Sequence, residues 1–198
     1  MTTRNVQSNN KKWENGIRER LFSFVVDYLL GNNLDSLTFS IISKETGISR
    51  TTLYSHYGNI YDILNDLSSF YENLLLEELK TSGFEKIKDM NMLSECTSIF
   101  LKFVFQHKNY YSALDKICLK SNLLERFKEG FKNQFSCYLT IDGFHAKEYV
   151  FTYWWNGFSS VIESWVKNQF EESPEEIFDV LMFCYKHSDF KASDNPQI

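Results

Sequence analysis

The stretch of residues 37–64 constrains the fold most strongly, because helix caps and a glycine punctuate it at short intervals. Thr38 can begin a helix, since its hydroxyl can accept a hydrogen bond from a backbone N–H two or three residues later. Gly47 tolerates the left-handed conformation that ends a helix and turns the chain. Ser49 then offers a second cap. This spacing predicts two short helices joined by a tight turn at Gly47.

The second of these helices, residues 50–57, is predicted to have one apolar and one polar face. Leu53 and Tyr57 are four residues apart, so both are expected to pack inward. The opposite face carries Arg50, Thr51 and Tyr54. Arg can bond a guanine edge through two hydrogen bonds, and the Thr methyl can contact a thymine methyl. Two short helices joined by a glycine turn form the arrangement whose second helix enters the major groove. The simpler alternative is a solvated polar face on a small surface helix.

The run from Thr38 to Tyr57 has the pattern T-x-x-x-I-x-x-x-x-G-I-S-x-x-T-L-Y-x-H-Y. This pattern resembles the DNA-binding domain of TetR-type transcriptional regulators, and the similarity extends from about Trp13 to Leu67. The resemblance implies contacts with base edges from Ser40, Arg50, Thr51 and Tyr54. It implies contacts with phosphates from Thr38, Thr52, Ser55 and His56. Ser49, the cap of the second helix, completes the set of predicted DNA-binding residues.

Four residues depart from the TetR pattern. Ser43 and Thr46 stand where Ala is usual, Ser55 replaces a usual aromatic residue, and Ile60 stands where a phosphate-binding Lys is usual. Each neutralised phosphate adds to affinity through counterion release, so the loss of that Lys lowers the expected strength of non-specific binding. Ser55 and Ile60 leave open an alternative interpretation, in which the protein is a transcriptional co-activator or a protein-interaction dimer of the same fold with weak DNA binding.

The whole chain is predicted to be all-α. Its 198 residues include only 8 Gly and 2 Pro, too few for an all-β fold with many tight turns. Apolar residues recur at helical spacing, which predicts further helices over 13–30, 59–81, 91–106, 110–118, 122–139, 145–170 and from 174 onward. Gly31 is expected to supply the stop of the first helix. The chain then divides into a disordered polar tail (1–12), a three-helix helix-turn-helix DNA-binding domain (13–62) and a helical ligand-binding and dimerisation domain (63–198).

Charge is distributed unevenly along the chain, whose formal net charge is -5. Residues 1–57 hold seven Lys and Arg against five Asp and Glu, a net charge of +2. The remaining residues hold 14 against 21, a net charge of -7. This asymmetry fits a mildly basic DNA-reading head on an acidic body that repels DNA.

Several classes of protein and site are not expected. The four cysteines are widely spaced and predict reduced, mostly buried thiols, with a redox sensor as the alternative: Cys96, Cys118, Cys137 and Cys184. Cys184 and His187 are three residues apart, but two ligands make no zinc site. No catalytic motif occurs, so we expect neither an enzyme nor a cofactor. The polar N-terminus and the lack of an apolar run of 18 residues predict a soluble, cytoplasmic protein without a membrane contact.

The C-terminal part is rich in aromatic residues. The run W-W-N-G-F-x-x-x-I-x-x-W, beginning at Trp154, is similar to the C-terminal region of a TetR subgroup that includes regulators of dihydroxyacetone kinase operons. We expect a helical interface with a second copy, with these candidate residues: Gly157, Val161, Trp165, Phe178 and Leu181. Gly157, in mid-helix, predicts a close backbone approach. Candidate ligand-pocket residues are Phe100, Phe103, Phe127, Phe131 and Trp154, and the alternative for each of these positions is plain core packing.

Together, these patterns predict a homodimeric regulator that binds a palindromic operator in double-stranded DNA. A two-fold pair of heads reads two half-sites about one helical turn apart, whereas one head contacts too few bases. The expected sign is repression, released when a small-molecule effector of unknown identity binds the C-terminal domain.

Overall fold

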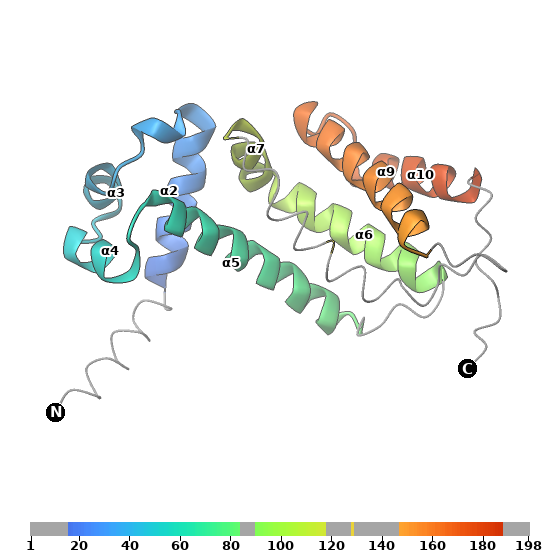
Figure 1. Ribbon diagram of the computed structural model, residues 1–198, viewed down its shortest axis with the longest axis horizontal. Coiled ribbons are helices and arrows are strands. Elements are labelled where there is room, and N and C mark those ends of the chain that lie inside the picture. The colour runs from blue at the N-terminus through green and yellow to red at the C-terminus, as the bar shows by residue number, and fades with distance from the viewer. Residues whose placement is uncertain (1–15, 84–89, 118–127, 129–146, 188–198) are drawn as a thin grey trace.

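The computed structural model describes residues 16–83, 90–117, 128 and 147–187, and these residues form eight α-helices and no strand. The first half contains α2 (Arg18–Gly31), the 3-10 turn η2 (Leu34–Ser36), α3 (Phe39–Thr46), α4 (Arg50–His56) and α5 (Ile60–Thr81). The second half contains α6 (Met90–Gln106), α7 (Lys108–Lys116), α9 (Lys147–Lys167) and α10 (Pro174–His187). The prediction of an all-α chain is confirmed for the described residues (Figure 1).

Some predictions lie outside the described residues. These are the polar tail, Trp13, the helix expected over 122–139 apart from residue 128, Cys118, Cys137 and the pocket candidates Phe127 and Phe131. No helix in the described part of the chain is long and apolar enough to cross a membrane.

Helix starts follow the caps that the sequence offers. Asn59 accepts a hydrogen bond from the backbone N–H of Asp62, and the Asp62 carboxylate accepts from the N–H of Asn59, so α5 begins with a reciprocal capping box. At α10, Ser173 and Glu176 exchange the same pair of bonds. The hydrogen bonds from Ser173 lower the pKa of the Glu176 carboxyl. The predicted starts of both helices are therefore confirmed.

Of two glycine predictions, one is confirmed and one is not. Helix α2 ends at Gly31, as expected, although Gly31 does not have a positive φ. The next residue, Asn32, caps the helix, because its backbone N–H and its side-chain amide both donate to the Tyr28 carbonyl. Gly157 has no atom within 4 Å of the position that a Cβ would occupy, so no described residue of the chain makes the predicted close approach to it.

The buried apolar side chains form two cores. One core joins α2, α3 and α4 to the first half of α5, and it includes Leu21, Ile42 and Leu53. The other joins the far part of α5 to α6, α9 and α10, and it includes Leu75, Phe103 and Trp165. We call the first the head core and the second the body core.

Helix α7 links the two halves of the molecule. It follows α6 after a single residue, yet its buried residues Tyr110, Ala113 and Leu114 belong to the head core. The Lys116 ammonium also donates to the Leu30 carbonyl near the end of α2. Figure 1 shows α7 beside α2, between the head helices and α9. Apolar packing therefore crosses the boundary expected at residue 62.

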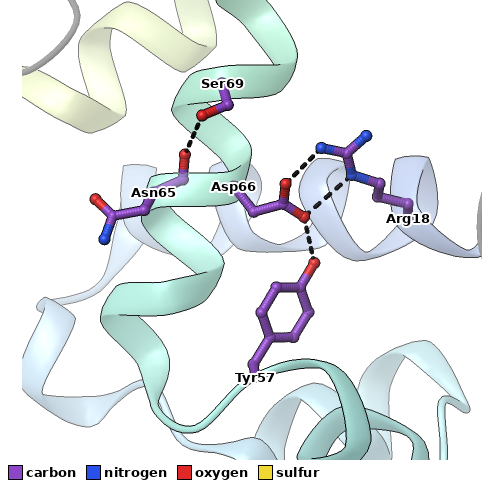
Figure 2. A network of polar contacts seen from close by, with 5 residues as sticks. All are labelled: Arg18, Tyr57, Asn65, Asp66 and Ser69. Carbon is purple, nitrogen blue, oxygen red and sulfur yellow. Dashed lines mark hydrogen bonds and ion pairs between the residues drawn. The ribbon is translucent and has the colours of Figure 1, made fainter.

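A polar network fixes the start of α5 to the helices around it. The Arg18 guanidinium on α2 forms two hydrogen bonds with the Asp66 carboxylate on α5, one of them from Nε at 3.1 Å. The Tyr57 hydroxyl, directly after α4, donates to the same carboxylate at 2.6 Å (Figure 2). The Arg18 guanidinium also lies 5.1 and 5.5 Å from the ring centroids of Phe22 and Phe70. One carboxylate therefore ties α2, α4 and α5 together.

The hydroxyl of Tyr57 should contribute measurably to stability. Burial and then the hydrogen bond to Asp66 raise the pKa of Tyr57 well above its usual range, so the hydroxyl remains a donor. Because its acceptor is charged, Tyr57→Phe is expected to lower the free energy of unfolding by about 1–2 kcal/mol, measured by urea denaturation. The matched control is Tyr28→Phe, whose hydroxyl bonds Ser36 in an exposed position; it should cost about 0.5 kcal/mol or less. Equal losses in the two variants would contradict the special role of Asp66.

Candidate nucleic-acid interface

Helices α3 and α4 have the caps and the turn expected of a helix-turn-helix. Thr38 Oγ1 accepts a hydrogen bond from the Ile41 N–H at 3.3 Å at the start of α3. Gly47 has a φ of 71°, the left-handed conformation that ends α3. Ser49 Oγ accepts from the Thr52 N–H at 3.0 Å and so begins α4. The predicted boundaries of both helices are confirmed to within one residue.

Thr46, one of the departures from the TetR pattern, has a structural role in the turn. Its side chain is buried, and its hydroxyl donates to the Ile42 carbonyl at 2.6 Å and accepts from the Ile48 N–H at 3.2 Å. A buried hydroxyl costs free energy unless it is bonded, and here both its donor and its acceptor functions are used. Thr46 therefore closes the turn around Gly47 through its own hydrogen bonds.

Helix α4 packs its apolar side against the head core and exposes its polar side to solvent. Leu53 is fully buried and Tyr57 is 6% exposed, as predicted. The exposed residues of α4 are Arg50, Thr51, Tyr54, Ser55 and His56, while Thr52 is half-buried. Ser40 and Thr38 are exposed on and next to α3, and Ser49 is exposed at the cap. The structure thus brings all nine predicted DNA-binding residues onto the exterior of one helix-turn-helix.

Phe39, which the sequence pattern did not indicate, supports this surface. Phe39 is buried, and its ring meets the Tyr54 ring edge-on at a centroid distance of 4.7 Å. Tyr54 nevertheless remains 64% exposed. An edge-to-face aromatic contact contributes about 0.5–1.5 kcal/mol and restricts the ring. Phe39 therefore holds Tyr54 in position while leaving most of it available to a partner.

The hydroxyl groups of this helix-turn-helix surface differ in whether their protons are free to form a hydrogen bond with a phosphate. Thr38 Oγ1 acts as an acceptor in its cap, so its proton remains available for a phosphate. Ser49 and Thr52 bond one another at 2.7 Å, which occupies one of their two protons. Ser55 donates its proton to the Thr52 carbonyl at 2.7 Å. A phosphate contact from Ser55 would therefore require it to give up a bond within the helix.

The first turn of α5 carries a second residue that the sequence argument missed. Ile60, at the position of the usual phosphate-binding Lys, is half-buried against the head core. Tyr61 follows it and is 58% exposed. The chain therefore presents a phenol, with one hydroxyl donor, one residue after the position where an ammonium group was expected.

The predicted pocket residues of the body lie among other aromatic rings. Phe100 and Phe103 are buried in the body core, and Trp154 is partly buried against it. Phe100 and Trp154 both contact Phe158, at centroid distances of 5.5 and 5.1 Å. Phe103 contacts His107 at 4.4 Å. In the described residues these side chains pack against neighbouring rings, and the ligand pocket stays a prediction.

The candidate dimer-interface residues fall into two groups. Trp165 and Leu181 are buried by the chain itself, and Trp165 Nε1 donates to the Glu172 carbonyl at 2.8 Å. Val161 and Phe178 are partly buried, and Gly157 is exposed. The sequence argument did not single out the large apolar residues that α9 and α10 leave exposed: Tyr149, Tyr153, Val180 and Phe183.

The exposed residues of α9 and α10 form stripes at helical spacing. On α9 the stripe is Tyr149, Tyr153, Gly157, Ser160 and Ser164; on α10 it is Glu176, Val180 and Phe183. Both stripes border a cavity of about 380 Å³, which is lined in part by Ser160, Ser164, Glu176 and Val180. The two helices therefore present one continuous outer surface, which we call the α9–α10 face.

The head and body cores meet at a group of rings around the α6–α7 corner. Tyr71 on α5 stacks on Tyr110 of α7 at a centroid distance of 3.9 Å. His107, between α6 and α7, contacts Tyr71 at 5.1 Å. Burial lowers the pKa of His107, and the negative charge of Glu78 partly opposes this shift. The surroundings of His107, between the two cores, therefore favour its neutral form.

No cluster of metal-ligating side chains occurs in the described ranges. A comparison with known protein families finds no match, and a comparison with curated proteins finds none either.

The neutral state of His107 predicts a pH dependence of stability. Its pKa in the folded chain lies below its unfolded value of about 6.5, so the unfolded chain binds more protons in this range. The free energy of unfolding should therefore be highest above about pH 6.5 and should fall as the pH drops from there through the lower folded pKa. His107→Gln should remove this part of the pH profile, measured by urea denaturation at several pH values. A pH profile that is the same in His107→Gln as in the wild type would contradict the assignment.

Proposed function

We propose that this protein is a dimeric DNA-binding transcriptional regulator of the TetR type, which represses transcription until a small molecule binds its helical body. The observation that carries the proposal is the polar face of α4. Arg50, Thr51 and Tyr54 are exposed there, on a helix whose opposite side is fixed by buried Leu53. A recognition helix needs such an exposed face on a firm support, because base readout depends on precise placement of a few side chains.

A second line of support is the coupling between this face and the rest of the chain. Tyr57 follows α4 directly and is bonded to Asp66 on α5. Helix α5 has 22 residues and is about 33 Å long, so a small tilt of its far end against the body would displace the head. An effector that binds better to the tilted arrangement would shift the population away from the one that fits the operator.

The α9–α10 face supports the dimeric part of the proposal. It exposes two Tyr, one Val and one Phe, and clustered aromatic residues are enriched in the buried parts of protein interfaces. Exposed Gly157 and two Ser on α9 would let a partner helix approach closely. A second copy related by two-fold symmetry would bury this face and place two heads on successive half-sites of a palindrome.

A specific observation also favours the second candidate, a co-activator or protein-interaction dimer with weak DNA binding. Ile60 is half-buried and carries no charge, and the Ser55 hydroxyl is already bonded to the helix backbone. The phosphate contacts expected at positions 55 and 60 should therefore be weaker than in the TetR pattern. The salt dependence of DNA binding separates the candidates: a regulator loses affinity steeply as salt rises, whereas the second candidate forms no specific complex even at low salt.

The DNA-binding proposal predicts the effect of two substitutions. Arg50→Ala and Tyr54→Ala should each weaken binding to the operator by about 1–3 kcal/mol, because each removes a base contact. The measurement is an electrophoretic mobility assay, or fluorescence anisotropy, with DNA from upstream of the protein's own gene. Arg20→Ala is the matched control, since it removes the same charge from an exposed position of the head on α2. Unchanged binding in the first two variants, or an equal loss in the control, would refute the role of α4.

The dimer proposal predicts that the exposed aromatic residues carry much of the association energy. Tyr153→Ser and Phe183→Ser should each weaken dimerisation by about 2 kcal/mol, the size expected for a central interface aromatic. Sedimentation velocity over a range of concentrations measures the change. Tyr61→Ser removes an equally exposed Tyr from α5 and should leave the dimer intact. A wild-type protein that sediments as a monomer at all concentrations would exclude the interface.

A further inference from the structure

A cavity lies where the head meets the body. It measures about 380 Å³ and is lined by residues of α2, α5 and the α6–α7 corner. This volume falls within the range of about 300–1,000 Å³ that small-molecule sites usually have. It lies beside the aromatic group around His107, at the border between the head core and the body core.

The lining combines rings with negative charge. Phe22, Phe70 and Tyr71 provide aromatic surface, while Glu19 and Asp27 on α2 provide two exposed carboxylates. Neither carboxylate forms an ion pair within the described part of the chain. The negative charge of Asp27 adds to burial in raising the pKa of Tyr71, which places that carboxylate near the ring.

The positive groups nearby do not cancel this charge. Arg18 lies over the rings of Phe22 and Phe70, but its charge is paired with Asp66. Lys108 lines the cavity and its ammonium lies 5.2 Å from the ring centroid of Phe105. The lining holds two carboxylates against one ammonium group. Rings beside unpaired carboxylates are the surroundings that attract an organic cation.

We propose that this cavity is a binding site for a small organic cation with an aromatic or similarly flat apolar part. The ammonium group would lie near Asp27, and the apolar part would lie against Phe70 and Tyr71. Glu19, about 12 Å away along α2, would add to the negative potential of the cavity. Since α2 belongs to the head core and His107 adjoins the body core, a ligand here contacts both halves of the molecule at once. Its occupancy therefore biases their relative arrangement to the extent that it prefers one arrangement.

Calorimetric titration of the full chain with phenethylammonium tests the site, without DNA. Two compounds of similar shape serve as comparisons: 2-phenylethanol, which is neutral, and 3-phenylpropionate, which is an anion. We expect the cation to bind about threefold or more tightly than the alcohol, and the anion not to bind, because a contact between an exposed carboxylate and an ammonium group is worth about a factor of three to five. No binding of the cation at millimolar concentration, or equal affinities for the cation and the alcohol, would overturn the proposal.

Substitutions locate the site. Glu19→Gln combined with Asp27→Asn keeps the shapes of both side chains and should weaken phenethylammonium binding about threefold or more. Glu77→Gln, at an exposed position on α5 outside the lining, is the control and should not change the affinity. Ser23→Trp fills the cavity from α2 and should abolish binding, with circular dichroism confirming that the variant folds. Unchanged affinity in the double variant, or binding that survives in a folded Ser23→Trp chain, would place the cation elsewhere. Because no DNA is present, these outcomes are independent of the operator assays.

Discussion

The arrangement of the head depends on the carboxylate of Asp66. Arg18 from α2 and Tyr57 from the end of α4 both donate to it, and Asp66 itself stands on α5. Arg18 and Asp66 are each less than one-third exposed, so their attraction is screened less than that of a surface pair. The exposed ion pair of Lys44 and Glu45 does not connect two helices, because both residues belong to α3. The charge of Asp66 therefore helps to set the orientation of the candidate recognition helix α4 relative to α5, together with the packing of Leu53 in the head core.

The second constraint is the division of the apolar side chains into two cores. Helix α5 contributes to both, and α7 leaves the body at His107 to complete the head. The head core is consequently joined to the body core in two ways. Helix α5 runs continuously through both, and α7 packs its apolar residues into the head core. Tyr71, Tyr110 and His107 lie where these connections meet. Any change in the angle between head and body must rearrange these rings, because close-packed interiors do not deform continuously.

The candidate DNA surface shows how local hydrogen bonding limits what exposed residues can do. The hydroxyls of Ser49 and Thr52 bond one another, and Ser55 donates to the Thr52 carbonyl. These groups already make hydrogen bonds within the helix, which leaves fewer donors for a bound partner. Arg50, Thr51 and Tyr54 are the exposed side chains on α4 that are proposed to contact bases. Tyr54 is supported by Phe39 and stays mostly exposed. The proposed specificity therefore rests on few side chains, which makes the surface sensitive to single substitutions.

The sequence by itself determined the local elements. Caps such as Thr38, Ser49, Asn59 and Ser173, with the left-handed turn at Gly47, act within four residues, so their spacing was enough to predict where α3, α4, α5 and α10 begin. The spacing of Leu53 and Tyr57 likewise predicted the buried side of α4, and with it the residues of the outer face. Only the tertiary structure decided the rest. The partners of Asp66, the support of Tyr54 by Phe39, the inclusion of α7 in the head core and the burial of Trp165 within the chain all depend on contacts between elements. Helical periodicity shows which side of a helix is apolar, but it carries no information about which other element covers that side.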